Sequence, residues 1–120
     1  MNRWVLLEHK ILSSKLIDLH YDFLVEDKLD CFTWKFHQIP LLNKGFVKIE
    51  AQPNHRLVWL TRDEYQLSNK RGFVKRIDHG TFSYISYNQD TQELKIILNG
   101  KLLEGLLMID DNLCQLTKNN

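Results

Sequence analysis

Apolar and polar residues alternate in short runs along most of this chain, and turn residues separate the runs. The alternation is clearest at residues 82–87, which read Phe-Ser-Tyr-Ile-Ser-Tyr. Successive side chains point to opposite faces of a β-strand, so a period of two predicts strands. We therefore expect an all-β protein in which about six to eight mostly antiparallel strands close into one compact β-barrel. The runs that fit strands are residues 4–7, 19–26, 31–36, 46–51, 57–61, 72–77, 81–87, 93–98 and 101–109.

Two segments carry local signals of their own. Asn99-Gly100 is the pair that a two-residue type I′ hairpin prefers, because both of its positions need a positive φ. Residues 11–19 place three leucines at the helical spacing i, i+4 and i+7, which predicts a short helical insertion there. Residues 38–45 are rich in turn formers and indicate a loop, and residues 62–71 are polar without a clear period.

Composition indicates a single domain over residues 1–120. A chain of 120 residues with 43% hydrophobic and 26% charged residues can bury one core. The net charge of +1 gives no overall attraction to nucleic acid, so any phosphate-binding surface must be local. Cys31 and Cys114 lack the CxxC spacing of zinc or redox sites, and we expect reduced thiols. Apolar runs are too short for a signal peptide or a membrane span, so we expect a soluble cytoplasmic protein with no membrane partner.

The second expected strand contains candidate metal ligands. His20 and Asp22 lie two residues apart, so they point to the same face of that strand. For an isolated pair of this kind, a face turned to water is the commoner explanation. His9 follows the first apolar run and Glu8, however, at the end of a first strand that can lie beside the second. Two histidines and a carboxylate form a facial triad, which suits Mn²⁺ or Fe²⁺ and leaves positions open for substrate or water.

Five motifs follow one another along the chain: RWVLLEH at 3–9, LHYDF at 19–23, PNHRL at 53–57, RIDHGTF at 76–82 and LNGKLLEG at 98–105. In this order they resemble the 3′-phosphoesterase domain of bacterial DNA ligase D, and most closely its small stand-alone relatives. The resemblance spans most of the chain. It implies a compact β-barrel that binds a divalent metal, typically Mn²⁺, through two histidines and an aspartate. Proteins of that family trim 3′-phosphates and 3′-terminal ribonucleotides from DNA ends.

Carried over to this chain, the resemblance implies His9, His20 and Asp22 as metal ligands. It implies His55 as a further catalytic histidine that contacts the phosphate. The expected activity is a hydrolase acting on phosphate ester bonds in DNA repair, with DNA or RNA 3′-ends as partners and separate ligase or polymerase repair proteins alongside. Weaker candidates for binding phosphate are Trp59 and the basic pair Lys70 and Arg71. For the basic pair, a solvated surface is the commoner explanation.

The chain departs from the family pattern at three places. Residues 10–19 form a longer segment between the two ligand histidines than the family has, which indicates an insertion. A register without that insertion would put Ser14 in place of His9, and we favour the inserted register. Leu24 stands where an arginine is usual, and Trp59 stands where a tyrosine is usual. These two changes suggest an alternative function, a catalytically degenerate homologue that binds nucleic-acid ends or a repair partner without cutting.

Overall fold

A single antiparallel sheet contains most of the chain. The computed structural model describes residues 2–12, 17–67 and 71–119. Within these ranges there are nine strands and one 3₁₀ turn. The elements are β1 Arg3–Leu12, β2 Ile17–Glu26, β3 Cys31–Phe36, β4 Val47–His55, η1 Leu57–Leu60, β5 Glu64–Gln66, β6 Phe73–Asn88, β7 Glu93–Asn99, β8 Glu104–Asp110 and β9 Leu113–Thr117.

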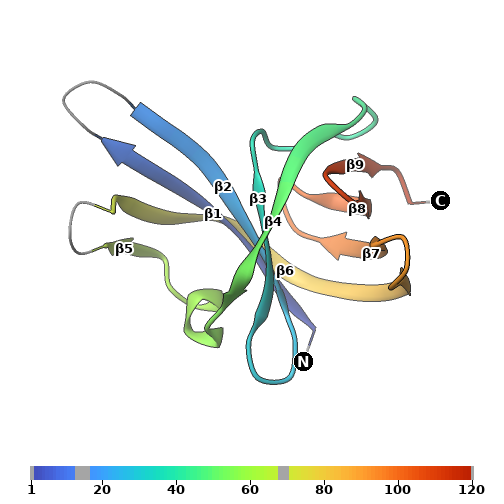
Figure 1. Cartoon of the computed structure of the whole chain (residues 1–120), viewed down its shortest axis with the longest axis horizontal. Helices are drawn as coiled ribbons and strands as arrows, with labels where there is room; N and C mark the ends of the chain where they lie inside the picture. Colours follow the sequence, from blue (N-terminus) through green and yellow to red (C-terminus); the bar gives the residue numbers. More distant parts are fainter. Residues whose placement is uncertain (1, 13–16, 68–70, 120) are drawn as a thin grey trace.

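The sheet closes in a ring. The strand order is β1-β2-β3-β4-β9-β8-β7-β6-β5, and β1 also pairs with β6. In Figure 1, β1, β2, β5 and the first part of β6 extend to one side, and the rest of β6 continues to the other side, where β7, β8 and β9 lie. The all-β expectation is confirmed. The nine strands exceed the expected six to eight, because β5 and β9 had no clear signal of their own.

The helix expected at residues 11–19 is wrong for the residues that the structure describes. β1 and β2 pair through to Leu12 opposite Ile17, and residues 13–16 lie outside the described ranges. Leu12 and Leu19 are 65% and 42% exposed, so no core covers the apolar stripe that an isolated short helix would need. Continuation of the strand ladder satisfies the backbone groups instead.

Two further local expectations are corrected. Residues 57–60 form the 3₁₀ turn η1 rather than a strand, and this turn buries Leu60. The β7–β8 connection is not a two-residue turn, since Asn99 pairs with Glu104 and residues 100–103 connect them. Neither Asn99 nor Gly100 has a positive φ. The Asp78 carboxylate accepts hydrogen bonds from the backbone amides of residues 101–103, and these bonds stabilise the wider turn.

Two hydrophobic clusters occupy opposite faces of β1 and β2. The larger contains Trp4, Leu6 and Phe23 with residues of β7, β8 and β9. The smaller consists of Val5, Leu7, Leu24, Cys31, Leu60 and Val74. The face of β2 that carries His20 and Asp22 also carries Leu24, which is fully buried in the smaller cluster. In the described part of the chain, no helix is long and apolar enough to cross a membrane.

Candidate metal centre

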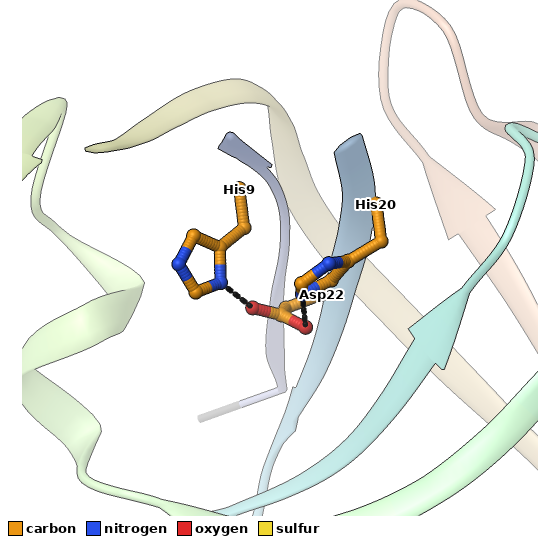
Figure 2. A group of neighbouring side chains, drawn as sticks. All are labelled: His9, His20 and Asp22. Atoms are coloured by element: carbon orange, nitrogen blue, oxygen red, sulfur yellow. Dashed lines mark ion pairs between the residues drawn. The ribbon is translucent and has the colours of Figure 1, made fainter. Parts of the chain in front are cut away.

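Pairing of β1 with β2 brings the three expected ligands together. His9 lies directly opposite His20, and Asp22 follows two residues later on the same face of β2. Each residue offers one ligand atom, and these atoms all lie within 4.8 Å of one another. Figure 2 shows the Asp22 carboxylate reaching both imidazole rings. His20 and Asp22 are 9% and 8% exposed, whereas His9 is only partly buried, so two of the three side chains lie mostly inside the fold.

The hydrogen bond of His9 identifies its ligand nitrogen. His9 Nε2 lies 2.7 Å from the carbonyl oxygen of Arg71. A carbonyl oxygen only accepts, so Nε2 carries the proton and Nδ1 keeps the lone pair of the neutral ring. Nδ1 faces Asp22 Oδ2 at 3.6 Å. The Asp22 carboxylate beside the ring raises the pKa of His9, although burial opposes this shift. Two electron-rich atoms that face each other in this way favour a proton or a metal cation between them.

Gly72 makes the contact between His9 and Arg71 possible. Its φ is +104°, a conformation that other residues rarely adopt. A Cβ at this position would lie 2.5 Å from the carbonyl oxygen of Lys10 and 3.2 Å from His9 Nε2. Only glycine therefore lets the chain pass closely enough to present the Arg71 carbonyl to the ring. Outer contacts of this kind orient metal-binding histidines.

His20 is held as the neutral ring that a metal requires. Its Nε2 lies 3.5 Å from Asp22 Oδ1, and burial is the main cause that lowers the pKa of His20. Its Nδ1 is buried and has no hydrogen-bond partner among the described residues. The nearest acid is Asp18 Oδ1 at 3.6 Å, which is beyond hydrogen-bond distance. A metal on Nε2 would leave a proton on Nδ1 that points toward Asp18, an arrangement common at metal centres.

Asp18 was not among the expected site residues, although its spacing gave a signal. Asp18, His20 and Asp22 alternate along β2 and so share one face. We predict that Asp18→Asn weakens Mn²⁺ binding about ten- to 100-fold, because His20 loses the charge that would orient it. Titration calorimetry measures this change, with Asp90→Asn at an exposed turn as the control. An affinity equal to that of the wild type would show that Asp18 has no part in the centre.

A cavity of about 510 Å³ opens beside the ligands. Its wall includes His9 and Asp22 together with three of the expected phosphate-binding residues, His55, Trp59 and Arg71. Lys70, the remaining candidate, lies outside the described residues. His55 Nδ1 lies 3.0 Å from the Pro53 carbonyl oxygen and must donate to it, which leaves Nε2 as the nitrogen that can meet a ligand.

Three polar residues of the cavity wall were missed by sequence reasoning. Arg56, Arg62 and Tyr65 line the same wall. Arg56 follows His55 directly, but Arg62 and Tyr65 lie in the polar segment that shows no periodic pattern. They reach the site because β5 pairs with the first part of β6, and β6 pairs with β1. No local spacing signals a placement that depends on closure of the ring.

The structure also gives the surroundings of Leu24 and Trp59. Leu24 is fully buried in the smaller hydrophobic cluster, so this position presents no polar group to the cavity. Trp59 packs edge-on against Tyr65, with ring centroids 5.4 Å apart.

In comparisons with known proteins, no family model matches this chain, and no curated protein matches it significantly.

Proposed function

We propose that this chain is a metal-dependent phosphoesterase that removes 3′-phosphates or 3′-terminal ribonucleotides from DNA ends in the cytoplasm. The closed ring of strands would then be the compact β-barrel of the DNA ligase D 3′-phosphoesterase domain. The observation that carries the proposal is the convergence of His9, His20 and Asp22 at one wall of a cationic cavity. DNA or RNA 3′-ends would be its substrates, and separate ligase or polymerase repair proteins its partners.

The charge of the cavity supports an anionic substrate. Three arginines and two histidines line it, and Asp22 is the only carboxylate among the lining residues that the structure describes. The chain as a whole carries a formal net charge of only +1. Positive charge is therefore concentrated at this wall, and a concave positive surface attracts phosphate.

The donor set fits a divalent cation such as Mn²⁺. Imidazole nitrogens and a carboxylate are the ligands of an open facial triad, and His9 Nδ1, His20 Nε2 and the Asp22 carboxylate face one another. A bound divalent ion supplies Lewis-acid stabilisation of phosphate charge and lowers the pKa of water. The Arg71 carbonyl keeps His9 in the tautomer that can bind it.

His55 is the candidate for proton transfer. Its bond to the Pro53 carbonyl orients the ring and keeps Nδ1 protonated, so Nε2 is the nitrogen that exchanges a proton. When protonated, Nε2 can donate to a phosphate oxygen or to the leaving oxygen of the ester. Leu7 and Val74 add apolar surface to the wall of the same cavity. This apolar surface limits the water around the reacting group.

The test is metal-dependent end processing. The purified protein is incubated with Mn²⁺ and a primer-template that carries a 3′-phosphate or a single 3′-terminal ribonucleotide. We expect release of phosphate or of the ribonucleotide. Asp22→Ala, prepared in parallel, controls for contaminating phosphatase. Equal release by both proteins, or no release by the wild type, would contradict the proposal.

Burial of Leu24 favours one second candidate, a degenerate module that binds ends without cutting them. Leu24 stands where the family usually has an arginine, and it is fully buried in the smaller hydrophobic cluster. It therefore offers no polar group that could take the place of that arginine. A protein that binds Mn²⁺ stoichiometrically and 3′-ends tightly, yet releases no product, would support this candidate over the phosphoesterase.

Metal binding should depend on pH in a defined direction. Asp22 raises the pKa of His9, whereas burial lowers the pKa of His20, and metal ligation requires both rings neutral. As pH falls through the raised pKa of His9, a proton competes with the metal there first. We predict that Mn²⁺ affinity falls about tenfold per pH unit below that pKa and is constant well above it. Calorimetry from about pH 5.5 to about pH 8.5 covers the histidine range. An affinity that does not change with pH would contradict this assignment of the ligands.

A further inference from the structure

Arg62 has an unusual position in the wall of the cavity. Its guanidinium carbon lies 4.5 Å from the centroid of the Trp59 ring and 4.2 Å from that of Tyr65. The two rings are nearly perpendicular, at 85°, so they form a corner in which the guanidinium lies. Cation–π contacts with two rings restrict the side chain before any ligand arrives.

These contacts leave the hydrogen-bond donors of Arg62 available. A guanidinium can lie flat over only one of two perpendicular rings, and the N–H donors on the edges that face neither ring stay free for a ligand. Within residues 2–12, 17–67 and 71–119, no carboxylate forms an ion pair with Arg62. Two other arginines differ in this respect, because Arg3 is bound by Glu26 and Arg76 by Asp63.

Partial burial of a charged group costs free energy unless another group compensates its charge. A bound anion would compensate the charge of Arg62. Arg62, His9 and Asp22 line the same cavity, so one bound anion could contact both Arg62 and the metal centre. A planar fork of donors matches two oxygens of a phosphate. Because the rings already restrict the side chain, binding loses less conformational entropy than at exposed Arg56.

We propose that Arg62 binds the terminal phosphomonoester of a nucleic-acid 3′-end and makes the site prefer a 3′-phosphate over a 3′-hydroxyl. This inference rests on the proposed function, since it names the group that positions the substrate at the same centre. Trp59 and Tyr65 act as positioning residues that hold the guanidinium in place.

The test measures binding without turnover. Oligonucleotides with a fluorescent 5′ label end in a 3′-hydroxyl or in a non-hydrolysable 3′-methylenephosphonate, and they are titrated with Mn²⁺-loaded protein. We expect Arg62→Ala to weaken binding of the phosphonate about ten- to 100-fold and to leave the 3′-hydroxyl strand unchanged. Arg62→Lys keeps the charge but not the fork, so its loss should be smaller.

Two controls separate a local effect from a general one. Lys44→Ala removes one positive charge at an exposed residue outside the cavity wall and should keep the preference. The Mn²⁺ affinity of Arg62→Ala should equal that of the wild type, which shows that the fold and the metal ligands are intact. Inorganic phosphate is the third probe. Binding of inorganic phosphate as tight as that of the phosphonate strand would overturn the assignment to a strand end.

The inference and the proposed function can fail separately. If Arg62→Ala keeps the preference for the phosphonate, or the wild type has none, the role of Arg62 is wrong even where hydrolysis occurs. If the preference depends on Arg62 but the wild type releases no phosphate from a 3′-phosphate, the binding role holds and the phosphoesterase proposal fails.

Discussion

Asp22→Ala should lower the affinity of the protein for Mn²⁺ by more than about 100-fold. Loss of a residue that only orients a metal ligand costs up to about 100-fold, and Asp22 would bind the metal itself. The Asp22 carboxylate is the only negatively charged member of the triad, and its two oxygens lie 3.6 Å from His9 Nδ1 and 3.5 Å from His20 Nε2. Without it, two neutral imidazoles remain, and they have little preference for a hard divalent cation. The free Mn²⁺ signal in electron paramagnetic resonance measures the change.

Asp22→Asn sharpens this experiment, because it keeps the size of the side chain and removes only its charge. It should also lose most of the Mn²⁺ affinity. Asp90→Ala, at an exposed turn, should bind Mn²⁺ as the wild type does. Wild-type affinity in Asp22→Ala would mean that the metal binds elsewhere, and an equal loss in Asp90→Ala would mean that the effect is not local.

Asp78→Ala should lower the free energy of unfolding by about 3–5 kcal/mol. The Asp78 side chain is buried, with 4% exposure, and its two oxygens accept hydrogen bonds from four backbone amides. These are the amides of His79, Lys101, Leu102 and Leu103. Each buried donor that is left without a partner costs about 1–3 kcal/mol. Urea denaturation followed by circular dichroism measures the loss.

The turn that Asp78 stabilises has little room to adjust. A Cβ on Gly100 would lie 2.7 Å from Asp78 Oδ2 and 2.5 Å from the Trp4 ring, so the backbone packs tightly on both. Water cannot easily replace the carboxylate there, which is why we expect a large effect. Asp90→Ala serves again as the control and should change stability by less than about 0.5 kcal/mol. A loss below about 1 kcal/mol in Asp78→Ala would contradict this role.

Part of the site followed from the sequence because strand geometry is local. The period of two along β2 correctly put His20 and Asp22 on one face, and the position of His9 after an apolar run correctly put it beside them. The same local reasoning failed at residues 11–19. Leucines at helical spacing can also fall in two paired strands, as Leu12 and Leu19 do, and only the pairing between the strands distinguishes this arrangement from a helix.

The remaining parts depend on contacts between residues distant in the chain. Burial of Leu24 requires Leu60 and Val74 to cover a second face of β2, and the position of Arg62 requires closure of the ring through β1 and β6. The role of Asp78 depends on a turn more than twenty residues away. No motif or period in a single sequence carries that information.

The most direct test of the metal centre is crystallographic. Crystals grown with Mn²⁺ should give one strong anomalous difference peak bonded to His9 Nδ1, His20 Nε2 and the Asp22 carboxylate. The same peak should be missing from crystals of Asp22→Ala. Well-ordered crystals with no peak between these three side chains at saturating Mn²⁺ would contradict the central claim that they form one divalent-metal site.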